Sequence, residues 1–222
     1  MFDYIKKVWL IGSTRVLLVG SLFSLALSAM RVLYTRDIFF LFLVWNLFLA
    51  FVPWFIASVA HIRKIRNWPI LAVLVVLWLA FFPNAPYILT DLIHLGKGWL
   101  APVWFDLILL LSYGFTGMLY GFVSLRMIGL ILVSKTEKPA AELLSIPLIY
   151  LACFGIYIGR FLRWNSWDLV SNLDSVLADI IVRVANPFSH TATWAFTILF
   201  GTLLNILYWS YKSFSPTDGS AA

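Results

Sequence analysis

The chain is poor in cysteine and in charged residues for its length of 222 residues. Its one cysteine, Cys153, excludes an intrachain disulfide and a Cys-based metal site. Asp, Glu, Lys and Arg make up 12% of the chain, whereas a soluble domain has about 25%. The sequence also lacks a glycine-rich phosphate loop, a GxSxG motif and an HExxH motif. The sequence therefore contains none of these catalytic motifs, and its low content of charged residues argues against a soluble protein.

Hydrophobic residues are correspondingly abundant, at 62% of the chain. One small core cannot bury so many, which indicates a polytopic membrane protein. The net charge of +6 then does not indicate nucleic-acid binding, because Lys and Arg in membrane proteins chiefly mark cytoplasmic loops. We therefore expect an all-α integral membrane protein whose partner is the lipid bilayer, with no nucleic acid partner.

Six apolar stretches are long enough, or nearly so, to cross about 30 Å of hydrocarbon as helices. The predicted spans, in a single transmembrane domain, are 16–34, 38–60, 69–83, 104–124, 143–160 and 190–208. The first contains a small-residue segment like a signal-peptide cleavage site, but its apolar run continues and favours a retained span. Pro83 and Pro86 are expected to end the third span, because proline removes a backbone donor and clashes with the preceding turn.

An even number of spans places both termini on one side of the membrane. Lys and Arg are more numerous on that side, which predicts that the N- and C-termini are cytoplasmic. Two connections on the outer side have helical periodicity, at 86–95 and 168–184, and are expected to lie as amphipathic helices in the outer interface. In the first, Tyr87, Thr90, Asp91 and His94 share one polar face.

Asp91 and His94 stand three residues apart on that face. With Asp106 as a third group, they are candidate ligands of a divalent metal ion, or a general acid or base with its orienting partner. The alternative is a capped interfacial helix that faces water or headgroups, with Asp106 complementing a helix dipole. The other candidate binding residues lie on the same predicted side: Asn84, Tyr87, Thr90, Arg160, Arg163, Asn165 and Asp168.

Arg160 and Arg163 lie one helical turn apart and are suited to holding a phosphate or carboxylate. The alternative is that they contact lipid headgroups or form ion pairs with nearby aspartates. Asp168 has a structural explanation, because Asn165 and Asp168 have the spacing of a helix capping box.

Three segments resemble a family of bacterial multi-pass membrane proteins, domain of unknown function family 1361. They are Pro83-Asn-Ala-Pro-Tyr-Ile-Leu-Thr-Asp-Leu-Ile-His-Leu95, Asn46-Leu-Phe-Leu-Ala50 and Gly159-Arg-Phe-Leu-Arg-Trp-Asn-Ser-Trp-Asp168. The resemblance covers the predicted second to sixth spans. It implies an integral membrane protein of the bacterial cell envelope, and it implies no activity and no role for any residue. Within the envelope, we expect the inner (plasma) membrane.

Three functions are compatible with these observations. The first is a binding or catalytic site at the outer interface for an anionic lipid headgroup or an envelope precursor. The second is a component of a transporter, since Pro53, Pro83 and Pro86 interrupt predicted spans. The third is a scaffold that docks another membrane protein through the glycine face of the fourth span, where Gly117 and Gly121 permit close approach. The sequence leaves open whether the protein is an enzyme and whether it binds a metal.

Overall fold

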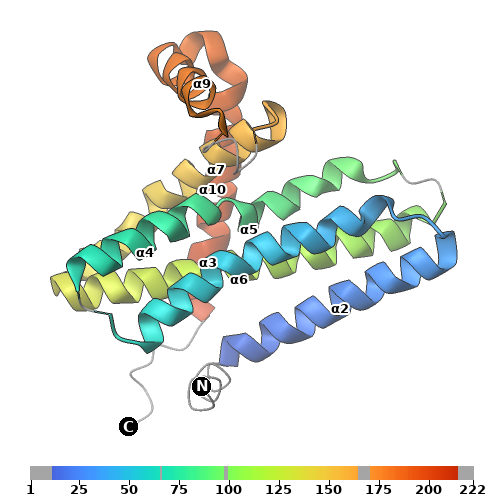
Figure 1. The fold of residues 1–222 in the computed structure, drawn as a ribbon, viewed down its shortest axis with the longest axis horizontal. Coiled ribbons are helices and arrows are strands. Elements are labelled where there is room, and N and C mark those ends of the chain that lie inside the picture. The colour runs from blue at the N-terminus through green and yellow to red at the C-terminus, as the bar shows by residue number, and fades with distance from the viewer. Residues whose placement is uncertain (1–11, 66, 98–99, 165–170, 215–222) are drawn as a thin grey trace. The chain divides into compact units, whose positions relative to one another are not determined.

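The computed structural model describes residues 12–65, 67–97, 100–164 and 171–214, and the elements in these ranges are helical (Figure 1). Six segments among them are long and apolar enough to cross a membrane. They are Ser13–Thr35, Phe39–Ile62, Trp68–His94, Val103–Thr136, Ala140–Phe161 and Pro187–Phe214. The predicted all-α class with six candidate spans is confirmed. The chain divides into two compact units, Met1–Pro139 (unit 1) and Ala140–Ala222 (unit 2).

The centre of unit 1 is helix α6 (Val103–Thr136). It packs against α2 (Gly12–Thr35), α3 (Phe42–Ile62) and the short helical segments that follow α4 (Trp68–Phe81). In α6, 67% of the most apolar 18 residues are buried, against 33% or less in the other candidate spans. The helix runs well beyond the predicted residue 124, because the sequence stays apolar, and it ends at Glu137 with a left-handed φ of 56°.

A proline break interrupts the third candidate span. Helix α4 ends at Phe81, and helical structure resumes in α5 (Asn84–Tyr87) and the 3-10 helix η2 (Ile88–His94). The Asn84 side chain does not cap α5 as a helix start would suggest. Its amide instead donates to the Phe81 carbonyl at 3.0 Å, which satisfies an acceptor at the end of α4.

The α5–η2 segment packs inside unit 1, which differs from the interfacial position expected for 86–95. It lies against α3 and α6, and Figure 1 shows α5 following α4 along the unit. Ala85, Pro86, Ile88 and Asp91 are buried. The proline pair therefore redirects the chain without sending it out of the bundle.

Glycines of α6 make this packing possible. A Cβ atom at Gly117 would lie 2.7 Å from the Ile88 side chain and 2.9 Å from the Ala85 carbonyl oxygen, and one at Gly121 would lie 3.0 Å from the Ala85 Cβ. The close approach that Gly117 and Gly121 were expected to permit is confirmed. The prediction that this face docks another protein is wrong, because the chain's own α5–η2 segment covers it.

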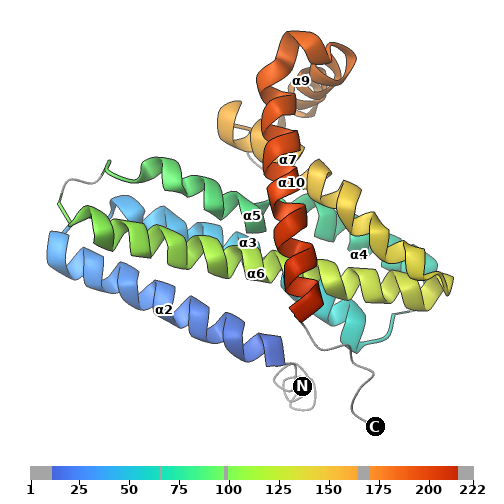
Figure 2. The ribbon, with the colours of Figure 1, turned by 180° about the vertical axis from the view of Figure 1, so that it is seen from behind.

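Unit 2 consists of α7 (Ser145–Phe161) packed on α10 (Thr191–Phe214), with η3 (Pro139–Leu144) leading into α7. Gly201 of α10 faces the Tyr150 ring, and the Tyr150 and Thr202 hydroxyls are 2.9 Å apart. Helix α9 (Leu173–Ala185) and η4 (Pro187–His190) precede α10, and Figure 2 shows α9 at the N-terminal end of α10. The first residues of the predicted helix 168–184 lie outside the described residues.

Candidate functional site

A buried ion pair joins α2 to α6. The Arg31 Nε donates to Asp106 Oδ1 at 2.8 Å, and Nη2 makes a longer contact of 3.4 Å to Asp106 Oδ2. The two side chains are only 1% and 2% exposed. Nη1 also contacts Asp37 Oδ2 at 3.4 Å, from the turn after α2. Arg31 therefore holds together the end of α2, that turn and the first turn of α6.

Aromatic rings surround this ion pair. The Arg31 guanidinium lies over the ring of Phe40, 4.5 Å from its centroid, in the 3-10 helix η1 (Phe39–Leu41). This cation–π contact stabilises the positive charge. One turn earlier in α2, the Ser28 and Tyr113 hydroxyls are 2.7 Å apart. A shallow recess opens beside the guanidinium; its lining residues are Ser28, Arg31, Val32, Asp37, Phe40 and Leu41.

Arg31 is a site residue that sequence spacing did not reveal. It lies 75 residues from Asp106, so no local pattern connects the two. The sequence did contain one indication that Arg31 belongs to a site. Arg31 has apolar sequence on both sides, and an arginine within a membrane span needs a partner.

Asp91 is fully buried. Its Oδ2 accepts a hydrogen bond of 2.9 Å from the Nδ2 of Asn46 in α3. The face of residues 86–95 that was expected to meet water or headgroups thus turns this carboxylate toward the protein interior. Asn46, which begins the family-like segment Asn46-Leu-Phe-Leu-Ala50, is a hydrogen-bonding partner of the carboxylate.

The imidazole of His94 lies among aromatic rings. Its centroid is 5.4 Å from that of Phe42 and 6.3 Å from that of Phe39, both in edge-on arrangements. Residues i and i+3 eclipse in a 3-10 helix, so Asp91 and His94 share a face of η2. Phe40 and Phe42, with centroids 6.1 Å apart, link His94 to the Arg31 group. We use the name polar cluster of unit 1 for two separate hydrogen-bonded pairs, Arg31–Asp106 and Asn46–Asp91, taken together with His94.

The structure does not gather Asp91, His94 and Asp106 as one metal-ligand group. Among the described residues, no three His, Cys, Asp or Glu side chains come close enough to hold a metal ion. The Asp106 carboxylate is engaged by Arg31, and that of Asp91 accepts from Asn46. The remaining candidate residues of this segment, Tyr87 and Thr90, are connected locally by a 2.6 Å bond from the Thr90 hydroxyl to the Tyr87 carbonyl.

The predicted anion-binding residues belong to unit 2. Arg160 lies in the last turn of α7, and Arg163 follows it in an exposed position with φ of 63°. Asn165 and Asp168, including their predicted capping box, lie outside the described residues. Arg163 therefore lies past the end of the helix, and the two arginines do not occupy successive turns of one helix as their spacing had suggested.

A second polar network fixes α9 to its own unit. The Trp164 indole donates to Asp179 Oδ2 at 2.7 Å, Arg183 pairs with Asp179 Oδ1 at 2.8 Å, and the Trp194 indole donates to the Arg183 carbonyl at 3.1 Å. The hydrogen bond from Trp164, assisted by Arg183, lowers the pKa of the Asp179 carboxyl below its usual 3.8. Asp179 is therefore charged at neutral pH.

Comparison with known proteins identifies one relationship. The family model "Protein of unknown function (DUF1361)" matches residues 45–207, which include Asp91, His94, Asp106, Arg160 and Arg163. Helix α2 with Arg31 precedes the matched segment. The searches of curated proteins and of solved structures find no match. The resemblance predicted from the sequence is confirmed: the chain belongs to the DUF1361 family, whose function is unknown.

Proposed function

We propose that this multi-pass membrane protein binds a polar ligand at a membrane–water interface through the polar cluster of unit 1. The observation that supports this proposal most is that the Asp91 carboxylate is fully buried. It lies on a segment that follows a proline break in a candidate span. Ionisable side chains at membrane depth are expensive and commonly mark functional sites. Apolar side chains could fill the same volume with equal or greater stability, so a purely structural role explains this group poorly.

The cluster assigns different roles to its members. Asp91 is an acceptor for hydroxyl or ammonium groups, and His94 on the same face of η2 is a donor or acceptor. Asp106 acts by holding Arg31, so it is a positioning residue. A lipid headgroup or an envelope precursor has such groups and reaches the interface from the bilayer. We propose Arg160 and Arg163 separately, as headgroup contacts at the end of α7.

Asp91→Asn is expected to weaken ligand binding about 10- to 100-fold, because it removes a charge-assisted hydrogen bond worth roughly 1.5–3 kcal/mol. The protein would be extracted with its surrounding lipid, and mass spectrometry would compare the polar molecules that co-purify. Asp174→Asn is the matched control, since Asp174 is exposed in α9 of unit 2. Equal recovery of each co-purifying molecule from a folded Asp91→Asn variant would reject the proposal.

A transporter component is the second candidate, and the break at Pro83 and Pro86 favours it. Interrupted spans line the binding regions of many transporters, and Asp91 follows this break within the segment Trp68–His94. Uptake of the identified ligand into reconstituted vesicles would favour transport. Binding without uptake would leave the interfacial site as the better explanation.

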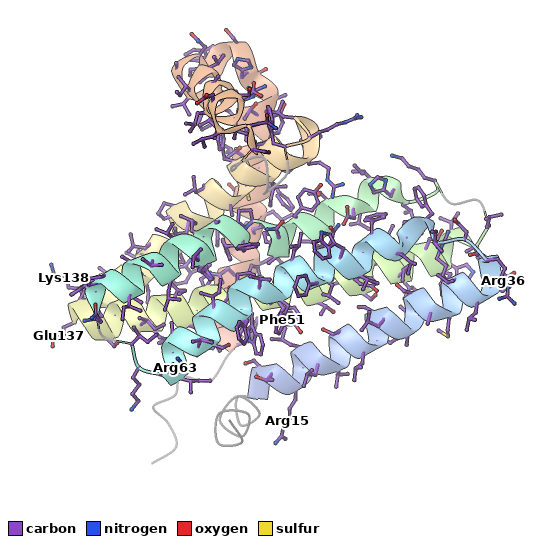
Figure 3. All side chains as sticks on the ribbon, in the orientation of Figure 1. Arg15, Arg36, Phe51, Arg63, Glu137 and Lys138 are labelled. Carbon is purple, nitrogen blue, oxygen red and sulfur yellow. The ribbon has the colours of Figure 1, made fainter. Side chains whose placement is uncertain are left out.

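We further propose that both termini are cytoplasmic in a bacterial inner membrane, which would place the polar cluster at the outer face. Figure 3 supports opposite ends for the loops of unit 1, with Arg36 at one end and Arg63 and Lys138 toward the other. A green fluorescent protein fused to the C-terminus should fluoresce, and alkaline phosphatase fused there should be inactive. The reverse pair of results would contradict this orientation.

A further inference from the structure

Helix α9 presents an apolar strip away from its own unit. Leu173, Leu177, Ile181 and Val184 are 47%, 42%, 61% and 56% exposed. At about 100° per residue they fall within an arc of about 80° on the helix. Phe188, just beyond α9 in η4, is 93% exposed. We call the four exposed apolar side chains within this arc, Leu173, Leu177, Ile181 and Val184, the α9 strip.

The other side of α9 is fixed, so the strip cannot turn inward. Val176 is 2% exposed, Asp179 accepts from Trp164, and Arg183 pairs with Asp179 while its carbonyl accepts from Trp194. Because these contacts reach the segment after α7 and the first turns of α10, they set the rotation of α9 about its axis.

The neighbouring helices identify what covers the strip. Helix α7 and helix α10 belong to candidate membrane spans, and only Asn186 and η4 separate α9 from α10. Such a short connection keeps α9 at the level where a span leaves the hydrocarbon. A helix with an apolar strip at that level is typical of interfacial helices, whose apolar faces lie about 5–10 Å into the boundary of headgroups and acyl chains.

We propose that α9 is a lipid-inserting helix, with the α9 strip and Phe188 buried in the headgroup–acyl boundary of the bilayer. The charges of the helix are Asp174, Asp179 and Arg183, and Arg183 is already paired with Asp179. No excess of positive charge on α9 draws it to anionic lipid. Its insertion therefore depends on apolar area and not on the headgroup charge.

Spin labels on two engineered cysteines test this proposal in the full chain. Ile181→Cys lies in the strip, and the matched control Ser175→Cys is exposed on the opposite side, about 120° from Ile181 and 180° from Val184 at 100° per residue. The native Cys153 is fully buried, so the unsubstituted chain reports its background labelling. The labelled proteins are reconstituted in phosphatidylcholine vesicles, with and without phosphatidylglycerol, and collision rates with oxygen and with a water-soluble nickel chelate are measured.

The label at 181 should collide several-fold more with oxygen than with the nickel chelate, and the label at 175 should show the reverse ratio. Both ratios should be the same in the two lipid mixtures. Equal access of both labels to the nickel chelate would overturn the proposal. A label at 181 that is shielded from both reagents would also overturn it, because it would show a second protein surface on the strip. If the label at 181 entered the bilayer only in vesicles that contain phosphatidylglycerol, the conclusion that insertion depends on apolar area and not on headgroup charge would be wrong.

Discussion

Replacing Arg31 with methionine is expected to lower the free energy of unfolding by about 3–5 kcal/mol, the usual effect of removing one partner of a buried ion pair. The reason is that Asp106 stays almost fully buried and loses its cation. Asp37 would not compensate, because it is a second carboxylate. Denaturation of the purified protein in mixed detergent micelles, followed by circular dichroism, measures the change.

The double variant Arg31→Met with Asp106→Leu is the decisive control. It removes both charges, so most of the lost stability should return. Lys212→Met is the matched control for an exposed pair, because Lys212 and its partner Glu142 are partly exposed, and its effect should stay within about 1 kcal/mol. If Arg31→Met has no larger effect than Lys212→Met, Asp106 is not an uncompensated buried charge, and the positioning role fails with it.

Gly117→Ala is expected to destabilise the protein by about 1–3 kcal/mol, as overpacking in a close-packed interior does. The added Cβ would lie 2.9 Å from the backbone oxygen of Ala85, which cannot move as a side-chain tip can. It would also press on Ile88, the first residue of η2, so the same variant should reduce ligand recovery through a displaced Asp91.

Gly129→Ala on the same helix is the matched control. A Cβ at Gly129 meets no atom within 4 Å, so alanine should stabilise the helix by about 0.5–1 kcal/mol. The two substitutions are chemically identical and differ only in what the new methyl group contacts. Changes of the same sign and size in both variants would contradict the packing of α5–η2 on the glycine face of α6.

Much of the fold could be predicted from the sequence because membrane spans are a local property. A helix crosses the hydrocarbon when about 20 successive residues are apolar, and this condition can be read without knowing any contact. That Asp91 and His94 lie on one face is an equally local property, since it follows from helical spacing alone. The family followed from a contiguous motif, Pro83 to Leu95, and the family match over 45–207 confirms it.

The character of the candidate site was decided by contacts between distant segments. Arg31 and Asp106 meet across 75 residues, and Asn46 and Asp91 across 45, and helical periodicity carries no information at those separations. The proline pair was correctly read as a break, but it does not determine where the chain goes next. The glycines of α6 decide that, because they allow the α5–η2 backbone close enough to bury Asp91 inside unit 1. Composition and spacing therefore determined the spans and the polar residues at their ends, whereas tertiary packing decided which of those residues are paired and which are buried.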